Sequence, residues 1–293
     1  MRILLTGRSG QVGYELERSL QGLGEVVALD RAGMDLSNLD QVRETILGLR
    51  PALIVNPAAY TAVDRAESEP ELAMRINGEA PAVMAEAARR IGAAMIHYST
   101  DYVFDGSKPG PYSEDDATAP INVYGRTKLA GEQAIEASGI PYLIFRTSWV
   151  YGARGHNFLL TMQRLARERD ELRIVADQTG APTWCRTIAD TTAHVVTALQ
   201  CAPAQAGLNE PRWREKTGLY HLAAQGQTTW HGFAQTIVAH GSSIRKPRVL
   251  PITTQDYPLP ARRPANSVLS CDKLIREFCG LPAWDDALKL CLE

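Results

Sequence analysis

The chain has 293 residues, of which 45% are hydrophobic and 22% are charged, and its formal net charge is -2. That length allows a substantial buried core, and the composition is typical of a globular enzyme. A charge so near zero gives no reason to expect nucleic acid or an anionic membrane as a partner. The N-terminal apolar run stops at Gly7 and no stretch of about 18 apolar residues follows, so we expect a cytoplasmic protein.

Apolar runs rich in β-branched residues alternate with helical patterns through the first half. Five runs predict strands, at residues 3–6, 26–30, 53–58, 93–100 and 142–149. Continuous apolar strands joined by helices indicate a parallel sheet covered on both faces. We therefore expect an α/β fold with a Rossmann-type, doubly wound parallel sheet.

Helical spacing is clearest at residues 38–49, where Ser37 and Asp40 suggest a capping box. A second segment, 71–91, is rich in Ala, Glu and Arg and ends at Gly92. Both segments are long enough to be crossover helices.

The pattern changes after about residue 150. Asn157 is placed to cap an amphipathic helix that runs to Arg169, and residues 187–199 read as another helix. We expect a dinucleotide-binding domain and a smaller C-terminal substrate-binding lobe. The domain covers 1–150 plus roughly 187–202, and the lobe covers 151–186 and 203–293.

The five cysteines all lie in the second half, at Cys185, Cys201, Cys271, Cys279 and Cys291. None forms C-x-x-C, and no histidine pair has the spacing of zinc ligands. We expect free thiols and no metal site.

Three glycines mark the junction of the first strand and the first helix, in Gly7-x-x-Gly10-x-x-Gly13. Glycines let the backbone turn tightly and approach a pyrophosphate, which then meets free N–H groups at the helix N-terminus. A plain strand-to-helix turn seldom needs three glycines at this spacing. We therefore predict a dinucleotide site at this loop, with Gly7 and Gly10 against the pyrophosphate.

Asp30 closes the second predicted strand, where a carboxylate can accept hydrogen bonds from the adenosine ribose. The neighbouring Arg31 can hold a 2′-phosphate instead, or it is a solvated surface charge. The choice between NADH and NADPH stays open.

Tyr124 and Lys128 stand four residues apart, on one face of a predicted helix. A lysine charge beside the phenol would lower its pKa, which is otherwise about 10, and prepare it for proton transfer to a carbonyl oxygen. Thr100, at the end of the fourth strand, is placed to polarise that oxygen, with Ser99 as the alternative. In a regular strand these two side chains would point to opposite faces.

Together these motifs resemble the extended short-chain dehydrogenase/reductases. Within that family the chain is similar to the dTDP-4-dehydrorhamnose reductases. The segments that carry the narrower resemblance are 61–67, 97–104, 145–151, 177–183 and 263–267. It implies NADPH- or NADH-dependent reduction of the 4-keto group of dTDP-4-dehydro-L-rhamnose, with Thr100, Tyr124 and Lys128 as the catalytic residues.

The resemblance also implies the binding residues. Further cofactor contacts fall on Gln11, Val12, Asp35, Leu36, Ala58, Ala59 and Tyr60, with Ser99, Tyr124 and Lys128 beside them. Substrate contacts fall on Val63, Glu67, Thr100, Asp101 and Trp149.

The residues themselves say less about the substrate. The Trp149 ring can lie against a sugar or belong to the core. Arg263, with its neighbour Arg262, can meet the diphosphate or be solvated.

Related reductases can hold magnesium at a dimer interface between acidic side chains. Glu15 and Glu293 fit such a role, but Arg186 is basic where the intervening position should be acidic. We predict no metal and leave a homodimer held by other contacts open.

Two other functions remain as alternatives. A nucleotide-sugar dehydratase or epimerase shares the Tyr-Lys pair, but dehydratases need Asp-Glu after the threonine, and here Asp101 is followed by Tyr102. A non-catalytic subunit resembling the methionine adenosyltransferase β subunit would not need Thr100, Tyr124 and Lys128 together.

Overall fold

The computed structural model describes residues 1–200, 210–241 and 244–293. Cys201 and residues 203–209 of the predicted lobe lie outside the described residues. None of the described helices is long and apolar enough to cross a membrane.

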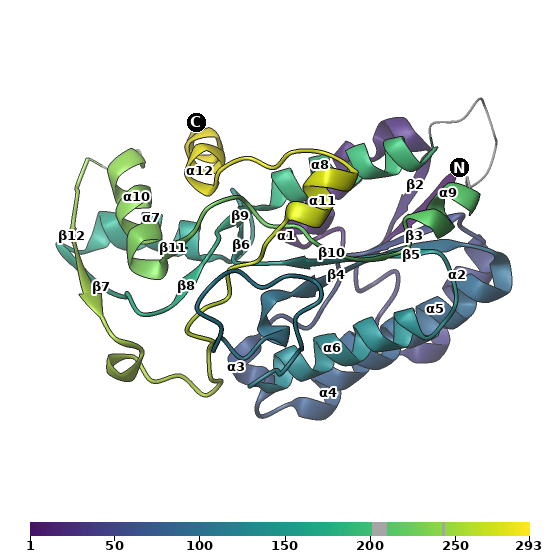
Figure 1. Cartoon of the computed structure of the whole chain (residues 1–293), viewed down its shortest axis with the longest axis horizontal. Coiled ribbons are helices and arrows are strands. Elements are labelled where there is room, and N and C mark those ends of the chain that lie inside the picture. The colour runs from purple at the N-terminus through teal and green to yellow at the C-terminus, as the bar shows by residue number, and fades with distance from the viewer. Residues whose placement is uncertain (201–209, 242–243) are drawn as a thin grey trace.

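A six-stranded parallel sheet forms the centre of the chain (Figure 1). Its order is β10-β5-β4-β3-β1-β2. The strands are β1 (Arg2–Leu5), β2 (Glu25–Ala28), β3 (Leu53–Asn56), β4 (Ala94–Thr100), β5 (Tyr142–Thr147) and β10 (Gly218–His221). The five predicted strands and the doubly wound α/β class are confirmed.

Strand β10 was not predicted, and residues 218–221 lie in the central sheet although the sequence placed them in the lobe. Gly218 pairs with Leu143 and His221 with Arg146, so β10 extends the sheet beyond β5. Residues 218–221 are of mixed polarity and show no clear alternation of a strand. Only their pairing with β5 identifies them as a strand. The two-part division of the rest of the chain stays a prediction.

Helices cover both faces of the sheet, as Figure 1 shows. One face carries α1 (Gln11–Ser19), α8 (Cys185–Gln200), α9 (Glu210–Glu215) and α11 (Asp272–Glu277). The other carries α2 (Leu39–Leu49), α4 (Pro70–Met74), α5 (Ala80–Ile91) and α6 (Val123–Glu136). Each layer buries its own apolar cluster, one around Leu5, Ile96 and Phe145 and the other around Ile54 and Met95.

Helix α8 lies against α1, as expected for a segment that returns to the first domain. Ser19 Oγ donates to Asp190 at 2.6 Å, and the Tyr98 and Thr192 hydroxyls lie 2.8 Å apart. These bonds tie α8 to α1 and to β4.

The capping box predicted at Ser37 and Asp40 is wrong. Helix α2 is capped by Asn38, whose side chain accepts a hydrogen bond from the Gln41 amide at 3.1 Å. Ser37 bonds to Asp35 instead, because its hydroxyl and amide both reach that carboxylate. The cap is one residue later than the pattern indicated.

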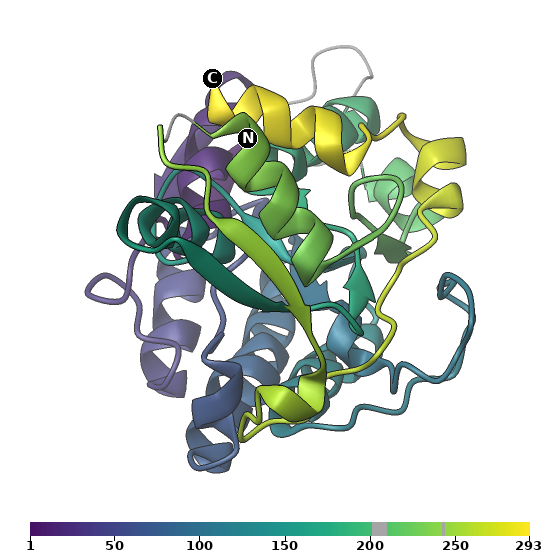
Figure 2. The same ribbon diagram turned by 90° about the vertical axis from the view of Figure 1, so that its left-hand side faces the viewer.

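A third apolar cluster lies beyond the sheet, in the part of the chain nearest the viewer in Figure 2. Tyr151, Leu159, Phe233 and Leu288 form its centre. Its elements are β6 (Val150–Tyr151), α7 (Phe158–Glu168), β7 (Glu171–Val175), β8 (Thr179–Gly180), β9 (Thr183–Trp184), β11 (Thr228–Thr229), α10 (Trp230–His240), β12 (Arg248–Ile252) and α12 (Trp284–Leu292). Asn157 caps α7 by accepting from the Leu160 amide at 3.0 Å, as predicted.

Four shorter helical turns complete the description. They are Gln21–Leu23, α3 (Val63–Ala66), Asp101–Val103 and Thr254–Asp256. A π-helical turn, Arg75–Glu79, joins α4 to α5, and Gly92 ends α5 in the left-handed conformation.

Candidate active site

A cavity of about 780 Å³ opens at the carboxyl ends of the sheet strands. In an open parallel sheet this edge is where ligands bind. All predicted catalytic and cofactor residues line it, namely Gly7, Gly10, Gln11, Val12, Asp30, Arg31, Asp35, Leu36, Ala58, Ala59, Tyr60, Ser99, Thr100, Tyr124 and Lys128. Their roles stay predictions, but the fold brings them together.

The glycine loop forms one wall of this cavity. A Cβ on Gly13 would stand 2.0 Å from the Gly7 carbonyl oxygen, so only glycine allows this close approach. Helix α1 begins at Gln11, and its N-cap residue Gly10 contributes no side chain. The first amides of α1 therefore border a cavity that a pyrophosphate can enter.

Asp30 and Arg31 lie at the far end of the same wall. Asp30 Oδ1 accepts from the amides of Ala32 and Gly33, at 3.0 and 3.1 Å. Arg31 is largely exposed and lies 3.3 Å from Asp35, whose pKa is lowered mainly by its hydrogen bonds with Ser37. Two carboxylates and one guanidinium thus face the position expected for the adenosine ribose.

Asn77 was not predicted as a site residue, yet it fixes the loop that holds Tyr60. Its side chain accepts from the Tyr60 amide at 2.8 Å and donates to the Tyr60 carbonyl and to Thr127 Oγ1, both at 3.1 Å. It lies in the π-helical turn between α4 and α5. An asparagine inside an Ala-rich helical segment was the available signal, because it is a weak helix former.

Helix α6 presents Tyr124 from its first turn. Asn122 caps the helix by accepting from the Gly125 amide at 2.7 Å, and Glu67 accepts from the Val123 amide at 2.8 Å. A Cβ on Gly125 would lie 2.1 Å from the Tyr102 carbonyl oxygen, so glycine lets α6 approach the end of β4. Glu67, predicted to bind substrate, lies outside the cavity wall and holds this helix terminus.

Thr100 stands where β4 ends, beside Tyr124. Its hydroxyl donates to Asp101 Oδ1 at 3.0 Å, and Ser148 Oγ donates to Asp101 Oδ2 at 3.1 Å. Burial raises the pKa of Asp101 to about 6, although hydrogen bonds from Ser267, Thr100 and Ser148 lower it. Asp101 lines the cavity, as predicted.

The predicted effect of Lys128 on the Tyr124 phenol is wrong for this structure. Burial and the nearby Asp101 carboxylate raise the pKa of Tyr124 to about 12, and a hydrogen bond with Thr100 lowers it. The Lys128 ammonium bonds to the Tyr98 carbonyl and lies beside His97, both on β4. The phenol is therefore protonated at neutral pH, as a proton donor must be, although the raised pKa makes it a weaker acid.

Lys128 lines the cavity and is almost fully buried. Its Nζ donates to the Tyr98 carbonyl oxygen at 2.6 Å and lies 3.1 Å from His97 Nε2. Burial lowers the pKa of Lys128 to about 8, while Glu132 raises it. The ammonium is thus the main form at neutral pH.

Two buried hydroxyls in the cavity wall, Ser99 Oγ and Thr147 Oγ1, have no hydrogen-bond partner among the described residues. Ser99 and Thr100 both line the cavity, so the expected separation onto opposite faces does not exclude Ser99 from the site. Buried hydroxyls are normally paired. Together with the glycine loop, they fit a polar cofactor.

Trp149 lies at the lobe end of the cavity and is in the left-handed region, with φ of 45°. Its ring stacks on Trp230, with centroids 3.6 Å apart and an angle of 7° between planes. Trp230 also lines the cavity and was not predicted. The sequence indicates only that Trp230 begins a helix, because Thr229 before it is a typical N-cap residue.

Val63 lines the cavity, but Arg263 does not. The Arg263 guanidinium binds both carboxylate oxygens of Asp64, at 2.5 and 2.7 Å. Arg263 therefore connects the C-terminal segment to α3 instead of reaching into the cavity.

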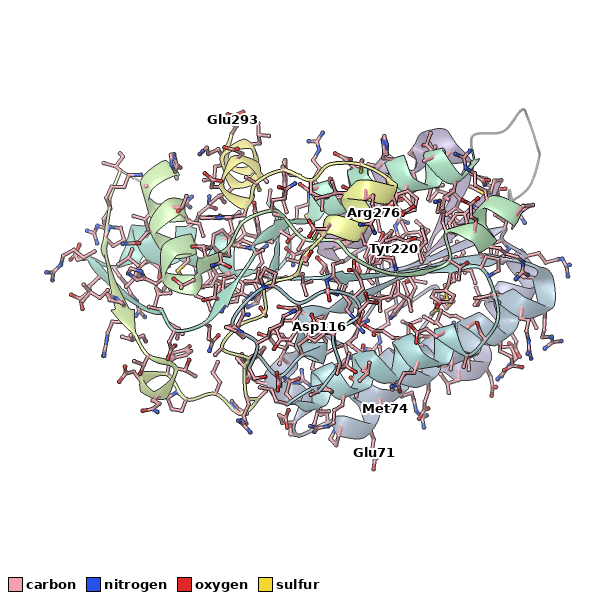
Figure 3. The ribbon with its side chains drawn as sticks, in the orientation of Figure 1. Glu71, Met74, Asp116, Tyr220, Arg276 and Glu293 are labelled. Carbon is pink, nitrogen blue, oxygen red and sulfur yellow. The ribbon has the colours of Figure 1, made fainter. Side chains whose placement is uncertain are left out.

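Of the three positions considered for magnesium, Arg186 carries a positive charge and is engaged by a neighbouring carboxylate. Arg186 pairs with Asp190 at 3.6 Å, and Glu293 lies at the outer end of α12 (Figure 3). Within residues 1–200, 210–241 and 244–293, no group of three His, Cys, Asp or Glu side chains is placed to hold a metal ion. The four described cysteines are free thiols.

Known proteins resemble this chain over its whole length. The family model described as RmlD substrate binding domain matches residues 1–293. A dTDP-4-dehydrorhamnose reductase of Burkholderia thailandensis is 50% identical over 299 residues, covering 100% of this chain and 98% of that protein.

Two solved structures agree with this result. The dTDP-4-dehydrorhamnose reductase of Clostridium acetobutylicum superposes with a TM-score of 0.89 at 35% identity, covering 99% of this chain and 98% of the other. That of Bacillus anthracis, in complex with NADP, gives 0.88 at 35% identity, with the same coverage.

Proposed function

Because the chain belongs to the dTDP-4-dehydrorhamnose reductase family, we propose that its cavity binds NADPH or NADH together with dTDP-4-dehydro-L-rhamnose. The chain is an oxidoreductase that reduces the 4-keto group to give dTDP-L-rhamnose. The observation that carries the proposal is the convergence of Thr100, Tyr124 and Lys128 on one cavity that begins at a glycine loop.

The nucleotide would be held along the wall from Asp30 to Lys128. The amides at the start of α1 meet the pyrophosphate, and Asp30 and Arg31 face the adenosine ribose. When bound, the nicotinamide supplies the hydride. The third N–H of Lys128 and the unpaired hydroxyls of Ser99 and Thr147 are available to the ribose and the carboxamide.

Tyr124 is the proton donor in this mechanism. Its raised pKa keeps the phenol protonated at neutral pH, so a proton is available to the substrate oxygen as negative charge develops there. To donate to that oxygen and polarise the carbonyl, Thr100 would turn its single O–H away from Asp101 and toward the substrate. Lys128, positively charged in the cavity wall, would hydrogen-bond the nicotinamide ribose.

Trp149 and Trp230 would form the sugar end of the site. Two stacked rings offer a flat apolar wall at the cavity mouth. Val63 and Asp101 complete the contacts proposed for the substrate. Glu67 and Arg263 act through α6 and α3, without touching it.

The dehydratase alternative lacks its acid residue. Tyr102, which follows Asp101, packs edge-on against Tyr124, with ring centroids 6.0 Å apart. Burial raises the pKa of Tyr102, so it cannot replace a carboxylate.

Location and assembly are part of the proposal. A cytoplasmic location is supported by the four free cysteines among the described residues. A homodimer without a bridging metal is the proposed assembly, and light scattering of the purified chain tests it.

The test is to mix the purified chain with synthetic dTDP-4-dehydro-L-rhamnose and NADPH deuterated at its transferable position. We expect dTDP-L-rhamnose that carries deuterium at C4 of the sugar, with NADH as a parallel arm. A cofactor that stays bound and oxidised, with no net reduction, would favour an epimerase. Absence of any turnover together with capture of a synthetase partner would favour the non-catalytic subunit.

A further inference from the structure

Four polar residues form a continuous buried line below the cavity. Thr6 follows β1, Asn56 ends β3, His97 lies within β4 and Lys128 lies on α6. All four are almost fully buried. The line therefore runs from the glycine loop to the proposed catalytic lysine, through the centre of the sheet.

Each neighbouring pair in this line is within hydrogen-bond distance. Thr6 Oγ1 lies 2.6 Å from Asn56 Oδ1, Asn56 Nδ2 lies 3.1 Å from His97 Nδ1, and His97 Nε2 lies 3.1 Å from Lys128 Nζ. A histidine buried in a parallel strand is unusual, because its polar atoms need partners that such a strand does not supply. Here both ring nitrogens have one.

The ammonium of Lys128 has three N–H donors to satisfy. One bonds to the Tyr98 carbonyl and one is directed at His97 Nε2, which leaves the third for the cavity. Burying an ammonium without hydrogen-bond acceptors disfavours its charged form. The acceptor at His97 Nε2, in addition to the Tyr98 carbonyl, therefore helps to keep Lys128 charged.

We infer that His97 is a positioning residue, which accepts a hydrogen bond from the Lys128 ammonium at Nε2 and so fixes the lysine for the cofactor. For Nε2 to accept, Nδ1 must carry the ring proton, and the Asn56 oxygen must face it. A half-turn of the Asn56 amide exchanges its oxygen and nitrogen in place. The Thr6 hydroxyl can follow, because it both donates and accepts.

The charges around the ring agree with a neutral His97. Burial and the Lys128 charge lower the pKa of His97 well below its usual range. The adjoining segments carry further ionisable groups, namely Tyr124, Arg126, Glu132 and Glu136 on α6, Tyr142 and Arg146 on β5, Tyr98 on β4 and Asp101 after it. The Glu132 carboxylate is paired with Arg146, and His97 Nε2 lies within hydrogen-bond distance of Lys128 Nζ, at 3.1 Å.

Two substitutions of His97 distinguish the role of Nε2 from the role of Nδ1. His97→Gln places an amide near the position of Nε2 and keeps an acceptor for Lys128. His97→Asn reaches only the position of Nδ1, so it keeps a partner for Asn56 and removes the acceptor from Lys128. Both variants keep a polar side chain at position 97. They differ in whether that side chain can accept a hydrogen bond from Lys128.

The measurement is the dissociation constant of NADPH as a function of pH, with melting curves to confirm folding. Losing the acceptor at position 97 lowers the pKa of Lys128, so Lys128 loses its charge at a lower pH. NADPH binding should therefore begin to weaken at a lower pH than in wild type. We expect the midpoint to fall by about one pH unit in His97→Asn and to stay near wild type in His97→Gln. Equal midpoints in all three proteins, or equal shifts in both variants, would overturn the inference.

A wild-type measurement covers the case in which a variant does not fold. Nitrogen-15 NMR of labelled protein should show His97 protonated at Nδ1 below the midpoint, and the Nε2–H form there would overturn the inference. The inference rests on the proposed function through the contact of Lys128 with the cofactor. The NADPH titration and the NMR measurement are made without the keto sugar. A failure of the proposed substrate would therefore appear separately, as absent turnover.

Discussion

The hydroxyl of Thr100 donates a 3.0 Å hydrogen bond to the carboxylate of Asp101, its neighbour at the end of β4. This carboxylate is buried next to the proposed proton donor, and it raises the pKa of Tyr124. The same turn thus supplies a polarising hydroxyl and a charge that keeps the phenol protonated.

Asp101 should make the stability of the protein depend on pH in an unusual direction. Because burial raises its pKa to about 6, the folded state holds a proton between about pH 4 and pH 6 that the unfolded state has released. This group therefore lowers the free energy of unfolding as pH rises through that window, by on the order of 2 kcal/mol. Urea unfolding of wild type and Asp101→Asn at several pH values should show this difference, and parallel curves would contradict it.

Glu132 and Arg146 should contribute strongly to stability. They form a buried bidentate pair, at 2.9 and 2.6 Å, between α6 and β5. Glu132→Gln leaves the guanidinium without its counter-charge and should cost about 3–5 kcal/mol. Glu168→Gln, in an exposed pair with Arg164, is the control and should cost less than about 1 kcal/mol. Similar losses in the two variants, measured by urea unfolding, would refute this assignment.

Arg31 should decide how well NADPH binds relative to NADH. Its exposed guanidinium can meet a 2′-phosphate, so Arg31→Ala should weaken NADPH binding about tenfold, with NADH binding unchanged. Asp30→Ala should show the opposite preference, because it removes an acceptor for the ribose hydroxyls. Fluorescence titration with both nucleotides measures this, and equal losses for NADPH and NADH would argue against both contacts.

Trp149 should act on the substrate alone. Removing its ring in Trp149→Ala exposes the face of Trp230 and should raise the KM for the nucleotide sugar about tenfold, with cofactor affinity unchanged. Trp184→Ala is the control, because Trp184 packs in the lobe cluster outside the cavity wall. If both variants raise KM equally, Trp149 belongs to the core.

Local sequence patterns predicted most of the sheet and one wall of the cavity. Strands β1 to β5 are apolar runs bounded by turn residues, and the glycine loop follows directly from its spacing. Strand β10 was missed because its four residues become a strand only by pairing with β5. Its identity depends on a contact between residues about 75 positions apart, which local periodicity does not contain.

The site shows the same division. Tyr124 and Lys128 were identified from their spacing, but the direction of the lysine was not, because it depends on the Tyr98 carbonyl and on His97. Arg263 was predicted to meet a phosphate, yet its partner is Asp64, nearly 200 residues earlier. Trp230 reaches the cavity through the packing of the lobe. Such long-range pairings decide which polar side chains face a ligand.

The most direct test of the account is single-turnover reduction of dTDP-4-dehydro-L-rhamnose by wild type and Tyr124→Phe, each preloaded with NADPH. The account predicts that wild type forms dTDP-L-rhamnose and that the variant is slower by on the order of 10²–10⁴, with NADPH bound as tightly. A variant that turns over at the wild-type rate would contradict the assignment of Tyr124 as proton donor.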